Sequence, residues 1–124
     1  MRPLKPKKPV SIKEQTNEQI EMIVAVINRG YSDYVIDASR DAGATGATVL
    51  YGRSSIKKDD LELNGVALQA EKEIVLILVK KSIRKKVMQE ISDRTHLQER
   101  GNGICFCIPV NEVKGLTPFN KDKK

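Results

Sequence analysis

Aromatic, cysteine and histidine side chains are scarce in this chain. Its 124 residues include no tryptophan, three tyrosines, two phenylalanines, two cysteines and one histidine. A chain of this length forms one domain with one hydrophobic core, and that core must therefore be aliphatic. Because His96 is the only histidine, any Ser-His-Asp or Cys-His catalytic arrangement would depend on it alone. We expect no enzymatic activity and no catalytic residue.

The two cysteines, Cys105 and Cys107, are separated by one residue. A disulfide between them would be badly strained on a β-strand, and a zinc site would need further cysteine or histidine ligands. We therefore expect no metal site and interpret both cysteines as small core residues. Asp59 and Asp60 stand side by side in a polar segment, which is more typical of a solvated turn than of a catalytic carboxylate pair.

Long hydrophobic runs are also missing. No apolar stretch approaches the roughly 20 residues that a membrane-spanning helix needs. The basic N-terminal residues are not followed by an apolar segment of signal-peptide length. We therefore expect a cytoplasmic protein that is not embedded in a membrane.

The net charge of +6 is concentrated near the ends of the sequence. Residues 1–20 carry five basic and two acidic groups and residues 117–124 carry three and one, which leaves 14 against 13 in residues 21–116. A nucleic-acid-binding domain carries its basic charge on the folded part, so we expect no specific nucleic-acid partner. We expect a basic tail over residues 1–18, a folded domain over 19–116 and a C-terminal tail over 117–124.

The folded part consists of two halves with the same predicted order of strand, helix and strand. In the first half, the β-branched run 20–27 predicts a strand, and residues 33–42 predict a helix with Ser32 as its N-cap and Gly43 at its end. A second strand is expected over residues 47–51. The inner side of the helix is predicted to carry Val35, Ile36, Ala38 and Ala42.

The second half repeats this order. A strand over residues 73–79 ends at Lys80 and Lys81, Ser82 is placed to cap a helix, and a strand over residues 104–108 ends at Pro109. The helix is predicted from apolar residues at three- and four-residue steps, namely Ile83, Val87, Met88 and Ile91. Two β-α-β units in tandem predict an α+β sandwich, a ferredoxin-like β-α-β-β-α-β fold with an antiparallel sheet.

The predicted strands are apolar on both faces. Residues 74–79 are apolar at every position, and in the last strand Ile104, Phe106 and Ile108 alternate with the two cysteines. Helices cover only one face of such a sheet, so the second face should be polar if it met water. A bare apolar face would be an aggregation hazard. The pattern therefore predicts that subunits associate through their sheets.

Three segments in register carry a resemblance to a known family. They are residues 42–49 (AGATGATV), residues 71–79 (EKEIVLILV) and residues 101–110 (GNGICFCIPV). Together they resemble PII nitrogen-regulatory signal-transduction proteins, most closely the divergent PII-like branch, over residues 20–116. The resemblance implies a homotrimer with its sheets facing inward and with ligand clefts between neighbouring subunits.

The resemblance also implies two functional loops. The T-loop, about residues 54–69 here, would bind a target protein, an enzyme or a membrane transporter. Its candidate partner-binding residues are Ser55, Lys57, Lys58, Asp59, Asp60 and Leu61. The B-loop, about residues 98–103, would hold nucleotide phosphates. The candidate ligand-binding residues are Thr48, Arg53, Ser54, Arg100, Gly101, Asn102 and Gly103.

The residues of the B-loop allow two interpretations. Gly101 and Gly103 on either side of Asn102 could turn backbone N–H groups inward as an anion nest beside Arg100, or the glycines could form a turn that starts a strand. Thr48 matches a threonine that lies near the nucleotide base in the family, and it is equally well a β-branched strand residue.

The chain departs from the PII pattern at several positions. The family has a lysine after the second B-loop glycine, where this chain has Ile104, and arginines after the last strand, where it has Gly115 and Thr117. Arg53, Arg100 and Lys114 are the candidate substitutes. ATP, ADP or AMP as the sensed ligand is therefore a hypothesis. Residues 54–69 contain no tyrosine, so a tyrosine there cannot be uridylylated.

These features favour a regulatory protein that senses a small ligand and controls an enzyme or a transporter, as in nitrogen or carbon regulation. Two alternatives remain. A trimeric metal-tolerance-type protein shares the fold, but it would need more histidine or cysteine ligands than this chain has. An RNA-binding ferredoxin-fold module would stack bases on sheet aromatics, and the predicted strands offer only Tyr51 and Phe106.

Overall fold

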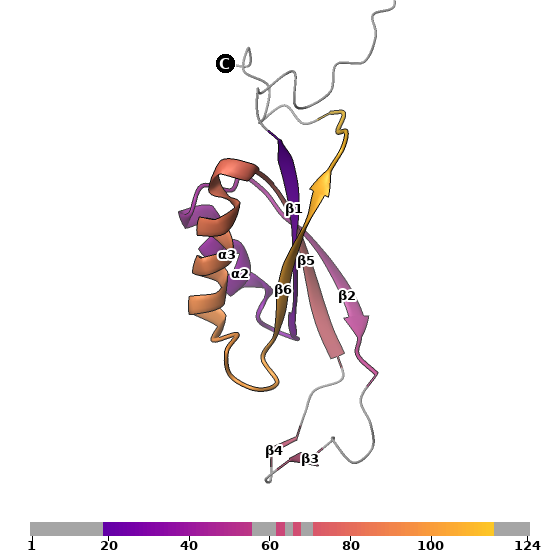
Figure 1. Ribbon diagram of the computed structural model, residues 1–124. Coiled ribbons are helices and arrows are strands. Elements are labelled where there is room, and N and C mark those ends of the chain that lie inside the picture. The colour runs from indigo at the N-terminus through magenta and orange to yellow at the C-terminus, as the bar shows by residue number, and fades with distance from the viewer. Residues whose placement is uncertain (1–18, 56–61, 64–65, 68–70, 116–124) are drawn as a thin grey trace, which may run out of the picture.

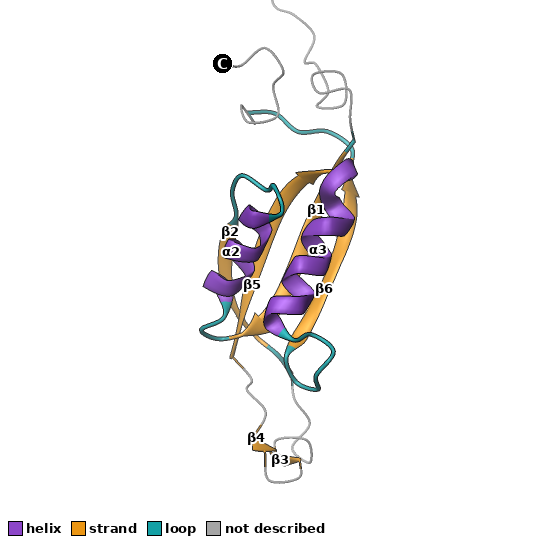
Figure 2. Ribbon diagram, turned by 90° about the vertical axis from the view of Figure 1, so that its left-hand side faces the viewer, coloured by secondary structure: helices purple, strands orange, loops and turns teal. Residues whose placement is uncertain are grey.

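The computed structural model describes residues 19–55, 62–63, 66–67 and 71–115 (Figure 1). Four long strands form one antiparallel sheet in the order β2-β5-β1-β6. They are β1 (Ile20–Asn28), β2 (Thr48–Arg53), β5 (Glu71–Lys80) and β6 (Gly103–Val110). The helices α2 (Ser32–Asp41) and α3 (Lys81–Thr95) lie side by side on one face of this sheet (Figures 1 and 2). The predicted ferredoxin-like order is confirmed.

The core between the helices and the sheet is aliphatic. Alternate residues of β1 and β5 point toward the helices because successive side chains of a strand face opposite ways. The fully buried members of this core are Ile23, Ala25, Ile27, Val35, Ala38, Val75, Ile77, Val87 and Ile91. Cys105 and Cys107 pack against it from β6, as the sequence predicts for small core residues. Burial raises the pKa of Cys105 to about 11, with a smaller contribution from Cys107.

The predicted C-terminal end of α2 at Gly43 is confirmed, whereas the two predicted N-caps are not. Helix α2 closes in a Schellman motif, in which the N–H of Gly43 donates to Arg40 O (3.0 Å) and the N–H of Ala44 donates to Ser39 O (2.9 Å). Gly43 has φ 113°, which suits glycine. The predicted N-caps are wrong, because Ser32 is already the first residue of α2 and Ser82 lies inside α3.

Tertiary contacts replace those caps. The backbone N–H of Ser32 donates to the Glu73 carboxylate on β5 (3.0 Å), and the N–H of Lys81 donates to the carbonyl of Gln19 (2.8 Å). The last strand also runs past its predicted end, since Pro109 lies within β6. Strand β6 is an edge strand, where a proline that lacks an N–H is tolerated.

The connection between β2 and β5 contains two short strands that the sequence analysis does not anticipate. These are β3 (Glu62–Leu63) and β4 (Val66–Ala67), which pair antiparallel. A signal for them was present, because Asn64-Gly65 stands between the two strands and is a dipeptide typical of two-residue hairpin turns.

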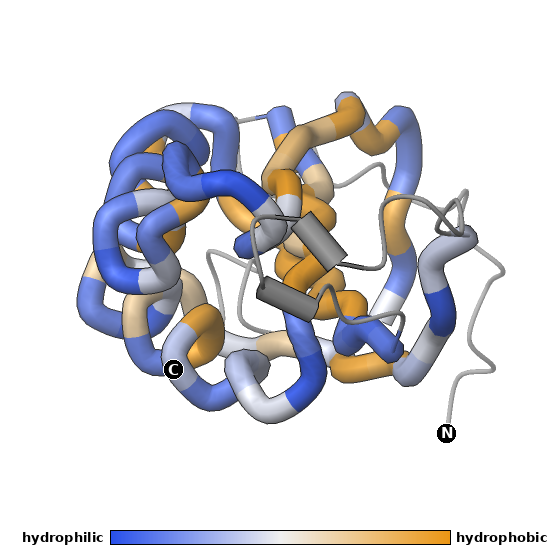
Figure 3. The backbone as a smooth tube through the Cα atoms, turned by 90° about the horizontal axis from the view of Figure 1, so that it is seen from below, coloured by the Kyte–Doolittle hydropathy of each residue, from blue (hydrophilic) through white to orange (hydrophobic). Residues whose placement is uncertain are grey.

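The second face of the sheet is apolar and has no helix of the described chain over it. The three outward-facing side chains of β6, Ile104, Phe106 and Ile108, are 59%, 42% and 44% exposed. Their row continues across the sheet through the register pairs to Met22, Val24, Val26, Leu50, Ile74, Leu76 and Leu78. In Figure 3 hydrophobic residues are frequent along the strands, whereas hydrophilic residues are frequent along the helices. We call this surface the open sheet face.

None of the helices that the structure describes is long and apolar enough to cross a membrane.

Candidate functional site

The two predicted loops leave the sheet at the same end. Strand β1 ends at Asn28, where β5 begins by pairing Lys72 with Asn28 and β6 begins by pairing Gly103 with Ile27. Strand β2 ends there as well, because Arg53 pairs with Glu71. We call this the loop end of the molecule; β3 and β4 extend beyond it in Figure 1.

Within one chain, the candidate ligand residues lie at opposite edges of the loop end. Arg53 and Ser54 are at the β2 edge, whereas Arg100 and Gly101 lead into the β6 edge. Three strand spacings separate these edges, which amounts to roughly 14 Å. Thr48 begins β2 opposite Leu76 in the middle of β5, about 17 Å from Arg53 along an extended strand. A single chain therefore does not bring the candidates together.

Two residues that the sequence analysis missed bridge part of this gap. Lys72 Nζ donates to Asn28 Oδ1 (2.6 Å), and Asn28 Nδ2 donates to the carbonyl of Gly101 (2.9 Å). Burial lowers the pKa of Lys72. The sequence pattern indicates only that Asn28 ends the predicted strand 20–27 and that Lys72 precedes the predicted strand 73–79. Their importance comes from the pairing of β1 with β5, which local pattern does not show.

The B-loop is a tight glycine turn fixed from both sides. Gly101 and Gly103 have φ values of 85° and 131°, which only glycine adopts readily. The Asn102 side-chain amide donates to the carbonyls of Thr95 (3.2 Å) and His96 (2.9 Å) at the end of α3. The backbone N–H of Asn102 donates to Glu99 O (3.3 Å). That N–H already donates a hydrogen bond within the turn, so it is not free to bind an anion.

Two arginines at the loop end keep their charge available. Arg53 and Arg100 form no salt bridge with any residue that the structure describes. In contrast, Arg29 is held by Glu71, with 2.7 Å between Nη1 and Oε1. An anionic ligand would therefore meet charge at Arg53 and Arg100 that no described carboxylate neutralises, whereas Arg29 is already paired.

A hollow of about 530 Å³ opens beside the base of the β2–β5 connection. Its lining residues are Arg29, Tyr51, Gly52, Glu71, Lys72 and Glu73. Two cations and two carboxylates balance there, so the hollow by itself has no preference for an anion. Hydrogen bonds from the Ser32 side chain and from the backbone N–H groups of Ser32 and Gly30, with the charge of Arg29, lower the pKa of Glu73 against the opposing effect of burial.

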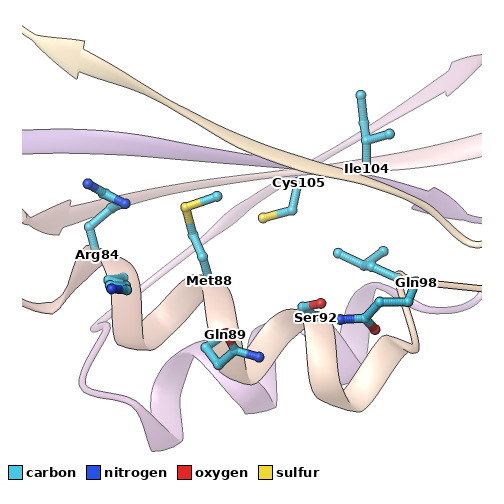
Figure 4. A pocket seen from close by; sticks show the side chains of 9 residues that line it. Arg84, Met88, Gln89, Ser92, Gln98, Ile104 and Cys105 are labelled. Atoms are coloured by element: carbon cyan, nitrogen blue, oxygen red, sulfur yellow. The ribbon is translucent and has the colours of Figure 1, made fainter.

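A second hollow of about 510 Å³ runs between α3 and β6 (Figure 4). Met88 and Cys105 point into it from the two elements, Gln89, Ser92 and Gln98 border it, and Ile104 points away toward the open sheet face. Its floor is apolar, and Arg84 at its border is held by Glu21, with 2.8 Å between Nε and Oε1. None of the B-loop glycines lines it.

The remaining sequence predictions lie mostly outside the described residues. Ser55 is described and exposed, whereas Lys57, Lys58, Asp59, Asp60 and Leu61 belong to a segment that is not described. In the described ranges, no three histidine, cysteine, aspartate or glutamate side chains are grouped so that they could hold a metal ion.

The sheet order, the antiparallel register and the two helices on one face define a ferredoxin-like α+β sandwich with a PII-like fold. The crystal structure of Arabidopsis thaliana PII bound to citrate is similar, with a TM-score of 0.61 and 24% sequence identity over 77% of this chain and 79% of that chain. No family model matches the chain, and no curated protein matches it in sequence. The likeness therefore establishes the fold.

Proposed function

We propose that the protein is a PII-like signal-transduction regulator, a homotrimer that binds a small anion and controls a target protein without catalysing a reaction. The observation that carries this proposal is the open sheet face, seen together with the PII-like fold. Apolar area of this kind gains roughly 25 cal/mol per Å² when it is buried, and three sheets facing inward would bury it.

Trimer formation would also complete the candidate site. If the β2 edge of one subunit lies beside the β6 edge of the next, Arg53 and Ser54 of the first subunit approach Arg100 and Gly101 of the second. The two arginines without described salt bridges would then face the same cleft. Lys72 would lie near them through its link to Asn28 and the B-loop.

The ligand is expected to carry less charge than a nucleoside triphosphate, or to bind as one only weakly. Ile104 stands where PII proteins have a lysine, and the N–H of Asn102 is already bonded within the turn. The similar Arabidopsis PII structure holds citrate, a small tricarboxylate, which supports adding a multivalent carboxylate to ATP, ADP and AMP as candidate ligands. The segment from Ser54 to Gln69 would bind the target, a cytoplasmic enzyme or a membrane transporter.

The aromatic side chains argue against the RNA-binding alternative. Register places Tyr51 opposite Glu73 on the helix side of the sheet and Phe106 opposite Val24 on the open sheet face. Stacking of successive bases needs aromatic side chains on one surface, and these two do not share one.

The proposal is tested by light scattering together with calorimetry. We expect a trimer at micromolar concentration, and binding of at least one anion among ATP, ADP, AMP, citrate, 2-oxoglutarate and bicarbonate. Arg100→Ala should weaken that binding roughly ten-fold or more, since a charge-assisted hydrogen bond contributes about 1.5–3 kcal/mol, and should leave the trimer intact. The matched variant Arg40→Ala, on the exposed side of α2, should change neither property. A monodisperse monomer would contradict the trimer, and equal binding by Arg100→Ala and the unmodified protein would place the ligand elsewhere.

A further inference from the structure

The ring of Tyr51, on the edge strand β2, is poorly covered by its own chain. It is 77% exposed, the largest fraction among the large hydrophobic side chains that the structure describes. Register pairs Tyr51 with Glu73, and it pairs Val49 with the fully buried Val75, so Tyr51 and Val49 lie on the helix side of the sheet. Tyrosine is enriched among the residues that anchor protein interfaces. The helix side of the β2 edge therefore presents an aromatic anchor.

The opposite edge of the sheet has a hollow in the same layer. Strand β6 is that edge, and the hollow of about 510 Å³ between β6 and α3 opens on the helix side (Figure 4). Met88, Leu97 and Cys105 supply its apolar lining, whereas Ser92 and Gln98 bring polar groups to its border. Such a hollow suits an aromatic ring that carries one hydroxyl group.

The two edges match in direction. Strand β2 runs toward the loop end and β6 runs away from it. In a ring of subunits whose rotation axis lies along the strands, β2 of one subunit is therefore antiparallel to β6 of the next. Both edges have backbone N–H and C=O groups that no strand of the described sheet pairs. A second copy of this chain thus meets the β6 edge with a suitable strand and with Tyr51 on the side of the hollow.

The register determines the level at which Tyr51 meets the next subunit. Within one chain, the row of paired residues that starts at Tyr51 passes through Glu73 and Ile27 to Gly103. Rotation about an axis along the strands keeps this level, so Tyr51 lies opposite Gly103 of its neighbour. An aromatic side chain opposite a glycine covers backbone that the glycine leaves bare. Cys105 follows on the same face about 7 Å further along β6, within reach of an aromatic side chain.

We propose that Tyr51 of each subunit inserts into the hollow between α3 and β6 of the next subunit, with its ring over Gly103 and against Cys105. The inference rests on the proposed trimer, because within one chain the two edges are three strand spacings apart, roughly 14 Å. It adds a contact on the helix side to the burial of the open sheet face. The same level brings Arg53 beside Gly101 of the next subunit, as the candidate anion site requires.

Light scattering over a dilution series tests the contribution of this residue. Tyr51→Ala should raise the dissociation constant of the trimer interface about 30-fold or more, as truncation of an interface anchor does. Tyr51→Phe keeps the ring and should assemble nearly as well as the unmodified protein. Lys86→Ala is the control, because Lys86 is an exposed residue of α3 that does not line the hollow, and it should leave assembly unchanged. Circular dichroism verifies that each variant is folded.

Cross-linking tests the location of the contact. In a Cys105→Ala/Cys107→Ala background, Tyr51→Cys/Gln98→Cys should give covalent dimers and trimers on a denaturing gel after treatment with a short bismaleimide. Tyr51→Cys/Lys86→Cys is the matched control and should give none, because Lys86 lies outside the hollow.

The outcomes separate this inference from the proposed function. If the unmodified protein is a trimer, Tyr51→Ala assembles equally well and positions 51 and 98 do not cross-link, the inference is overturned and the trimer stands. Cross-linking to position 86 instead of position 98 would place Tyr51 elsewhere on the neighbouring subunit and would also overturn the inference. An unmodified protein that is monomeric at micromolar concentration would overturn both.

Discussion

At the scale of single residues, Gly103 shows how a site residue can be required by the fold. A Cβ at this position would lie 2.2 Å from the carbonyl oxygen of Val26 and 3.1 Å from Ile27 Cα. The backbone at Gly103 also has φ 131°. The glycine therefore lets the first residue of β6 approach β1, whatever else the B-loop does.

Replacing this glycine should destabilise the protein strongly. For Gly103→Ala we expect a loss of about 3 kcal/mol or more in the free energy of unfolding, from backbone strain and from overlap with β1. Urea unfolding measures the change. Gly46→Ala is the matched control, because nothing lies within 4 Å of its added Cβ, and it should be neutral or slightly stabilising. Similar losses in the two variants would contradict this account.

Cys105 provides a second test at this scale. Burial raises the pKa of its thiol to about 11, and only the thiolate reacts readily. In a Cys107→Ser background, Cys105 should react with a thiol reagent at pH 8 much more slowly in the folded protein than in urea. Equal rates in the two conditions would show that the thiol is not buried.

At the scale of elements, the start of α2 is determined by a residue far away in sequence. Glu73 of β5 is 7% exposed and accepts a hydrogen bond from Ser32 N–H at 3.0 Å. A carboxylate at a helix N-terminus satisfies an otherwise unpaired donor and interacts favourably with the helix dipole. Strand β5 thus takes the place of a local cap and connects the β1–α2 turn to the base of the β2–β5 connection.

The lowered pKa of Glu73 predicts a pH dependence. A carboxyl group whose pKa is lower in the folded than in the unfolded state stabilises the protein fully above its unfolded pKa, and this contribution disappears as pH falls through the folded pKa. Glu73→Gln should therefore cost about 1 kcal/mol at neutral pH. Its difference from the unmodified protein should shrink as pH falls below about 4.5. Urea unfolding over a pH series measures both, and a difference independent of pH would contradict the assignment.

At the scale of the whole molecule, neighbouring residues of β5 face different environments. Ile77 is fully buried under the helices, whereas Leu76 is half-buried and belongs to the open sheet face. A lysine is costly in either place, but for different reasons. A charge at position 77 affects packing of the core within one chain, whereas a charge at position 76 affects burial of the open sheet face.

The pair Ile77→Lys and Leu76→Lys separates these two effects. Ile77→Lys should prevent folding, because it places a charge in the core. Leu76→Lys should leave a folded monomer, because it places the charge at the proposed contact between sheets. Circular dichroism and light scattering distinguish the outcomes. A Leu76→Lys protein that assembles as well as the unmodified chain would contradict burial of the open sheet face.

The sequence alone determined the order of the four long strands and the two helices, the aliphatic core and the apolar character of both sheet faces, because these follow from local periodicity. The inner positions of both helices and the alternation in β6 were predicted residue by residue. The tertiary structure decided what depends on strand pairing. It separated Arg53 from the B-loop by placing β2 and β6 at opposite edges, brought Asn28 and Lys72 to Gly101, and used Glu73 in place of Ser32 as the partner of the α2 N-terminus. Contacts between residues more than 40 positions apart leave no periodic trace in a sequence, since each is created only when the sheet forms.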